Sequence, residues 1–139
     1  MYSKILVPVE LDHEDLIPQK LAQARGMLSP GGEILVLTVL ESVPGYVSEF
    51  VTHKPPNHLT AEVEGKLKAL IGEADDVAIH VGTGKPGVEI PQFAEDHGCS
   101  LIIVGSHRPG IRDYFLGSTA ARTVRRAACS VMVVRPDPA

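Results

Sequence analysis

The run Leu101-Ile102-Ile103-Val104-Gly105 decides the fold class, because it is a continuous apolar stretch, mostly β-branched, that ends at a glycine. Runs without polar alternation are typical of strands buried on both faces, which occur mainly in parallel sheets. Three more such runs and one weaker, alternating one lie along the chain: Ile5–Val9, Ile34–Leu40, Val131–Val134 and, alternating, Val77–Val81. The sequence therefore predicts five short strands.

Helical patterns separate these runs. Apolar residues recur at helical spacing at Ile17, Leu21, Ala24 and Leu28, then at Val63, Leu67, Leu70 and Ile71. A third helix is predicted from Pro86 with Ile90, Phe93, Ala94 and His97 on its face, and a fourth from Ser118 through Val124 to Ala128. Ser29-Pro30-Gly31-Gly32 and Gly98 are predicted stops, and Pro91 predicts a late start or a kink in the third helix.

The alternation of strands and helices predicts an α/β fold. We expect residues 1–139 to form a single domain, a doubly wound five-stranded parallel sheet in the order 3-2-1-4-5 with helices on both faces. A length of 139 residues and 44% hydrophobic residues suit one core.

The composition of the chain argues against some classes of binding partner. A net charge of −4, no tryptophan and 4% aromatic residues argue against nucleic acid. No run approaches the ~20 apolar residues that span a bilayer, and the short start ending at Pro8 is expected to be a buried strand rather than a leader. Cys99 and Cys129 are expected to be reduced. The missing apolar span and the reduced cysteines together predict a cytoplasmic protein without membrane contact.

A ligand site is expected where the strand order reverses, beyond the carboxyl ends of strands 1 and 4. The loops that meet there are Glu10–His13 and Gly105–Leu116, and the second carries His107, Arg108 and Arg112. A helix then opens at Gly117-Ser118-Thr119, and helix starts favour phosphate groups. Glycine and serine are also ordinary turn and cap residues, so these residues alone leave both interpretations open.

Several segments together resemble the universal stress protein family. They are the opening Lys4–Val9, Leu37-Thr38-Val39, Gly84-Lys85-Pro86, Gly105-Ser106-His107, Leu116-Gly117-Ser118 and Cys129–Arg135. The resemblance covers nearly the whole chain except residues 41–59. Its Ser106-His107-Arg108-Pro109 and Leu116-Gly117-Ser118 segments are similar to those of an ATP-binding bacterial subgroup, and imply an adenine nucleotide alpha hydrolase-like fold.

The resemblance implies a nucleotide site. Its residues would be Pro8, Val9, Glu10 and Val39 at the ribose and base, and Gly105, Ser106, His107, Arg108, Gly117, Ser118 and Thr119 at the phosphates. Two departures from the family motif are visible: Arg108 replaces a glycine in a motif one residue shorter, and Glu10 replaces the usual aspartate. The ligand is expected to be ATP, with AMP or ADP as alternatives, and Mg²⁺ carried by the nucleotide. No catalytic residue and no protein metal ligand are assigned.

Other features have plainer interpretations. Gly82-Thr83-Gly84-Lys85 resembles part of a P-loop, but Ile79 and Pro86 occupy places that need glycine and serine or threonine. Residues 41–59 are either a lid or variable surface, with a short helix possible around 46–51. Arg122, Arg125 and Arg126 are interpreted as a solvated helix face, and Asp12 and Asp113 as solvated or capping carboxylates.

The last strand indicates self-association. Val131-Met132-Val133-Val134 would be an edge strand without charge or proline before Arg135, and such edges pair readily. The resemblance implies a homodimer through this strand.

Three functions compete. The leading one is a stress-response regulator that acts on an unknown protein partner through nucleotide-dependent conformation and dimerisation, with at most very slow ATP hydrolysis. An ATP-cleaving adenylyl-transfer enzyme is disfavoured, because Glu10-Leu11-Asp12-His13 replaces a glycine- and serine-rich loop. The third is a dimeric interaction module that has lost nucleotide binding.

Overall fold

The computed structural model describes residues 1–10, 16–41, 56–72, 74–106 and 116–135. Five strands and four helices alternate along them, with these bounds: β1 Tyr2–Pro8, α1 Ile17–Met27, β2 Leu28–Leu40, α3 Pro56–Ile71, β3 Val77–Thr83, α4 Pro86–Asp96, β4 Leu101–Gly105, α5 Ser118–Arg126 and β5 Ser130–Val134. The sheet has the order β3-β2-β1-β4-β5 and every neighbouring pair is parallel, which confirms the predicted topology.

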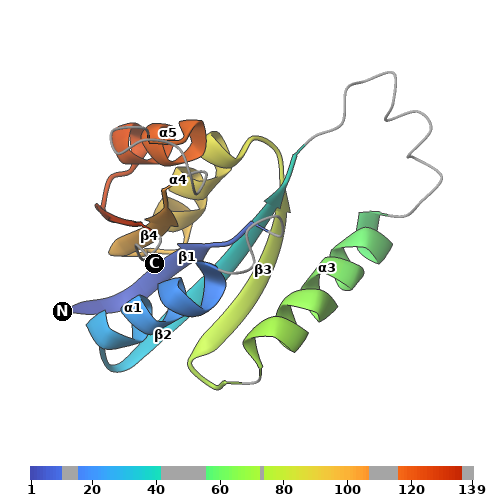
Figure 1. Cartoon of the computed structure of the whole chain (residues 1–139), viewed down its shortest axis with the longest axis horizontal. Helices are drawn as coiled ribbons and strands as arrows, with labels where there is room; N and C mark the ends of the chain where they lie inside the picture. Colours follow the sequence, from blue (N-terminus) through green and yellow to red (C-terminus); the bar gives the residue numbers. More distant parts are fainter. Residues whose placement is uncertain (11–15, 42–55, 73, 107–115, 136–139) are drawn as a thin grey trace.

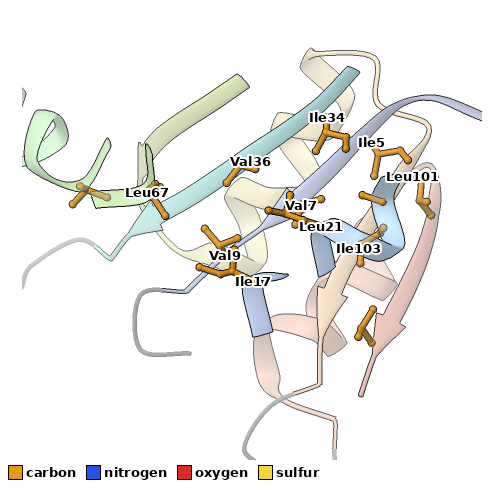
Figure 2. Close-up of a cluster of buried hydrophobic side chains, with 13 residues drawn as sticks. Ile5, Val7, Val9, Ile17, Leu21, Ile34, Val36, Leu67, Leu101 and Ile103 are labelled. Carbon is orange, nitrogen blue, oxygen red and sulfur yellow. The ribbon is translucent and has the colours of Figure 1, made fainter. Parts of the chain in front are cut away.

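The sheet separates two apolar layers. Alternate side chains of the central strands point to opposite faces: Ile5 and Val7 pack toward α1 and α3, whereas Leu6 packs toward α4 and α5. Figure 1 shows the first helix pair below the sheet and the second pair above it. Figure 2 shows the first layer, in which Ile17 and Leu21 of α1 meet the side chains of β1. Continuous apolar runs were therefore required, because both faces are covered.

The helix-to-strand connection near residue 28 corrects one prediction. Leu28 was expected on the face of the first helix, but that helix ends at Met27 and Leu28 begins β2. Leu28 pairs with Tyr2 of β1, and the next pair is Lys4 with Glu33, so the residues between them form an irregular excursion. Gly31, with φ of 78°, permits that excursion. The predicted stop is thus part of the strand.

Three further expectations need correction. Leu70 was placed on the buried face of its helix but is 44% exposed, whereas Val63 and Leu67 are buried in the core and Ile71 packs against it. Helix α5 ends at Arg126 rather than Ala128, and Val124 is 46% exposed. Residues from Pro56 belong to α3 rather than to an irregular stretch, while the proposed short helix at 46–51 lies outside the described residues.

Helix α4 follows the sequence closely. It begins at Pro86, so its start is not late, and Pro91 lies buried inside it. It ends before His97, which caps it instead of extending its face, and Gly98 follows with φ of 70° as the predicted stop. Helix α4 therefore starts at the carboxyl end of the sheet, which is the edge where a ligand is expected.

Candidate functional site: a pocket at the switch point

Strand β1 separates from β4 near the carboxyl edge of the sheet. The β1–β4 ladder pairs Ile5 with Leu101 and Leu6 with Ile102, whereas the β1–β2 ladder continues to the pair Pro8 and Leu37. Because β1 stays with β2, a gap opens between the ends of β1 and β4. This gap is the topological switch point of the sheet, where doubly wound proteins bind ligands.

A pocket lies at this gap. Strand ends, α1, α4 and the start of α5 all contribute to its walls, which are Pro8, Val9, Glu10, Leu16, Lys20, Leu37, Val39, Pro86, Ile90, Val104, Gly105, Ser106, Gly117, Thr119 and Ala120. The structure thus brings together eight of the residues singled out from the sequence: Pro8, Val9, Glu10, Val39, Gly105, Ser106, Gly117 and Thr119. They come from β1, β2, β4 and α5, segments far apart in the chain.

The remaining predicted residues are not placed at the pocket. Ser118 is exposed and does not line it. His107 and Arg108 lie outside the described residues, as do Asp12 and Asp113. The assignment of His107 and Arg108 to the phosphates therefore stays a prediction.

Backbone and side-chain hydrogen bonds hold the end of β1 in place. The backbone N–H of Val9 donates to Leu37 O at 2.8 Å, and the Thr38 hydroxyl donates to Val9 O at 3.2 Å, both from the β2 side. The carbonyl of Pro8 instead accepts a hydrogen bond from Lys20 Nζ at 2.6 Å. The polar backbone atoms at this strand end are thereby satisfied although the β4 ladder has stopped.

Lys20 is the polar residue that sequence reasoning missed. It lies on the buried face of α1 and is only 5% exposed. Burial lowers its pKa from 10.5 to about 8, and the nearby Glu10 carboxylate opposes part of that shift. The available signal was a charged residue next to Leu21 on the apolar stripe of a predicted helix.

The start of α5 is open toward the pocket. Gly117 is buried and is the N-cap, no side chain of the described residues caps this helix, and its first turn contains no acidic residue. The Thr123 hydroxyl donates to Thr119 O within the helix at 2.8 Å. The backbone N–H groups of the first turn are thus not engaged by a side-chain cap, which is the arrangement that attracts an anion.

Apolar residues form the rest of the pocket, and the sequence analysis did not assign them to the site. Leu16, Leu37, Pro86, Ile90, Val104 and Ala120 also line it. In sequence they are indistinguishable from core residues, because the strand ends that they cover separate only in the folded sheet. An apolar pocket with a few polar groups is the usual form of a small-molecule site.

Possible metal ligands, the cysteines and the lengths of the helices in the described part of the chain also bear on function. Within these ranges no group of three or more histidine, cysteine or acidic residues is arranged to hold a metal ion. Cys99 and Cys129 are free thiols, as expected, and burial raises the pKa of Cys99 to about 11. Among the described helices, none is long and apolar enough to cross a membrane.

Fold and pocket define the class: a doubly wound α/β protein with a small-molecule pocket at its switch point. The universal stress protein family model matches residues 1–135. The chain belongs to the universal stress protein family.

Related proteins and solved structures support this family membership. The chain is 30% identical to universal stress protein MJ0577 of Methanocaldococcus jannaschii, covering 97% of this chain and 96% of that protein. It is 28% identical to universal stress protein G of Shigella flexneri over 97% and 100% of the two chains. A solved structure of MJ0577 superposes with a TM-score of 0.78 at 28% identity, over 100% of this chain and 99% of the other.

A universal stress protein solved in complex with cAMP is more distant. It has a TM-score of 0.59 at 20% identity and covers 96% of both chains. This likeness shows the fold.

Proposed function

We propose that this chain is a regulatory universal stress protein that binds an adenine nucleotide in the switch-point pocket. ATP is the leading ligand, AMP and ADP are alternatives, and Mg²⁺ would arrive with the nucleotide. The observation that carries the proposal is the pocket itself, which joins the separated ends of β1 and β4 to the uncapped start of α5. That arrangement pairs an apolar wall for a base with a helix start for phosphate.

Each part of the pocket has a role in this proposal. Val39 at the end of β2 would meet the adenine, and Glu10 would accept hydrogen bonds from the ribose hydroxyls. Gly105 and Gly117 would allow phosphate oxygens to approach the backbone. The room at Gly105 is limited, because a β-carbon there would lie 3.2 Å from Leu16 Cδ1.

The enclosed volume sets a condition on this proposal. It is about 60 Å³, whereas small-molecule pockets commonly enclose about 300 Å³ or more. A bound nucleotide would therefore widen the pocket or extend from it into solvent. If the pocket widens by a shift of the start of α5 relative to the sheet, that shift would change the surface shown to a partner.

The first experiment asks whether nucleotide is bound at all. The purified protein is denatured, its supernatant is chromatographed for adenine nucleotides, and fresh protein is dialysed to equilibrium with ATP and Mg²⁺, with AMP and cAMP in parallel. About one nucleotide per chain is expected. Absence of both co-purification and millimolar binding would favour the interaction module that has lost the nucleotide.

Gly117→Val tests the place of binding. Its branched side chain would fill the pocket at the start of α5, so ATP affinity should fall by about 100-fold or more. Gly65→Val is the matched control, because a β-carbon at exposed Gly65 in α3 meets nothing within 4 Å. Equal ATP affinity of the Gly117 and Gly65 variants would exclude the start of α5 as the phosphate site.

We also propose a homodimer through β5. This strand pairs only with β4 among the described strands, and Val131, Met132 and Val133 are half-buried. The carbonyl of Val134 faces β4, since it accepts from Ser106 N, so the N–H of Val133 faces outward. Val133→Pro removes that outward donor and should convert the dimer to a monomer by light scattering. A dimer that survives this change does not pair through β5.

A further inference from the structure

Lys20 lies at the gap between β1 and β4. Successive residues of a strand direct their backbone polar groups to opposite sides. Val9 directs its N–H and carbonyl toward β2, so the Pro8 carbonyl points toward β4, and this carbonyl is the one that Lys20 Nζ contacts at 2.6 Å. The ammonium group therefore sits where the β1–β4 ladder has ended and the pocket begins.

A positive charge at this place is energetically unfavourable without a role. Lys20 is only 5% exposed, and taking an ammonium group out of water is costly. The Pro8 carbonyl needs a single donor, which a neutral side chain could supply, whereas an ammonium has three. A buried charge in the wall of a pocket is therefore a candidate for ligand binding.

The charge balance of the pocket points the same way. Among its described lining residues, only Glu10 and Lys20 carry a charge. Without Lys20 the one charged side chain among the described lining residues would be Glu10, and a carboxylate repels phosphate. With Lys20 the two charges of the lining balance, and the cation lies at the Pro8 carbonyl.

We propose that Lys20 is a binding residue of this pocket, whose buried positive charge attracts the anionic part of a nucleotide over the separated ends of β1 and β4. This inference rests on the proposed function. It goes beyond it by assigning the site a cation from α1, outside the phosphate loop.

The titration of Lys20 makes the proposal measurable. Its pKa of about 8 means that the group is half-neutral near pH 8 in the ligand-free protein. From β1, α1, β4 and α5, the one described titratable group that acts on it is Glu10. An anionic ligand favours the charged form, so binding near pH 8 should take up about half a proton per chain.

The wild-type protein provides the first measurement. ATP titrations by calorimetry at pH 8, in two buffers of different ionisation enthalpy, give the number of protons taken up. About half a proton is expected, with a fall in ATP affinity from pH 7 to pH 9.5. ATP binding without proton uptake and with a flat pH profile would overturn the inference while leaving the proposed function intact.

Variants supply the second measurement. Lys20→Met keeps the length and removes the charge, so ATP affinity should fall by about tenfold or more, adenosine affinity should change by less than about threefold, and proton uptake should vanish. Lys20→Arg keeps the charge and should retain more of the ATP affinity than Lys20→Met. Lys68→Met, at an exposed lysine of α3, is the matched control.

The outcomes separate the two levels of the proposal. If wild type binds no adenine nucleotide, the proposed function fails. If wild type binds ATP and Lys20→Met weakens ATP and adenosine equally, Lys20 supports the end of β1 only and the inference fails.

Discussion

Helices α4 and α5 both begin at the carboxyl edge of the sheet, yet their starts differ in what they offer an anion. Helix α4 follows a glycine- and lysine-rich segment, Gly82–Lys85, whose sequence looks more like a phosphate loop. However, its first turn contains Glu89, and that side chain lies against Gly84, where a β-carbon would be 2.8 Å from the Glu89 carboxylate. The negative charge already complements the helix dipole there.

Helix α5 has the opposite features. Its N-cap, Gly117, is buried in the pocket wall, and its first turn contains no acidic residue. From this difference we expect that glycine and lysine near a helix start are not enough to make an anion site. What matters is whether a carboxylate already occupies the first turn and whether the sheet opens beneath it.

The largest expected effect comes from placing a carboxylate at equivalent positions of the two helices. Gly117→Glu puts a negative charge at the N-cap of α5, inside the pocket, and should weaken ATP binding by about a thousandfold or abolish it. Lys85→Glu puts one at the exposed N-cap of α4 and should change the affinity by less than about threefold, measured by calorimetry. Similar losses in both would mean that the helix starts are not distinct in function.

The next largest effect concerns the pH dependence of stability, for which buried Lys20 in the pocket wall is compared with exposed Lys85 before α4. Lys20 has a pKa of about 8 when folded and 10.5 when unfolded, so between these values the unfolded chain binds more protons and stability rises with pH. Urea denaturation from pH 7.5 to 10.5 should show wild type gaining about 3 kcal/mol relative to Lys20→Met.

Exposed Lys85 supplies the control for this titration. Lys85→Met should follow the wild-type pH profile of unfolding free energy throughout. If Lys20→Met follows it as well, the ammonium group is not buried as the structure shows.

A smaller effect tests the turn before α4. Gly84 has φ of 130°, a conformation that other residues rarely adopt, so Gly84→Ala should destabilise the protein by about 2 kcal/mol. Because this turn is outside the pocket walls, ATP affinity should stay within about twofold of wild type. A large loss of affinity at unchanged stability would place ligand contacts at the turn before α4 as well.

The smallest effect concerns the negative charge of Glu89 in the first turn of α4. Glu89→Gln removes a carboxylate from the first turn and should lower the unfolding free energy by about 0.3–1 kcal/mol at low salt. Glu95→Gln, near the end of the same helix, is the matched control and should be neutral or slightly stabilising. Equal losses in both variants would mean that the helix dipole is not the cause.

The fold was predictable because its signals are local and repeated. Runs such as Ile34–Leu40 and Leu101–Val104 must be apolar on both faces, and right-handed crossovers then leave few possible strand orders. Errors fell at element ends, where tertiary pairing overrides local pattern. Leu28 fits a helical spacing, yet pairing with Tyr2 draws it into β2.

Part of the candidate site could be predicted for the same reason. The place of the strand reversal follows from the order of elements, so the sequence was enough to expect Glu10, Gly105 and Gly117 at one edge of the sheet. Lys20 and the apolar wall around Ile90 could not be predicted. Their role depends on which side chains face the gap where β1 leaves β4.

By itself, the sequence determined the five strands, their order, the family, and the edge at which the strand ends converge. Only the tertiary structure decided that the buried start of α5 lines a pocket at the strand reversal, and that a lysine from α1 lines the same pocket. The physical reason is that hydrophobic periodicity is encoded residue by residue. The accessibility of a helix start and the pKa of a buried ammonium depend instead on atoms brought together from distant segments.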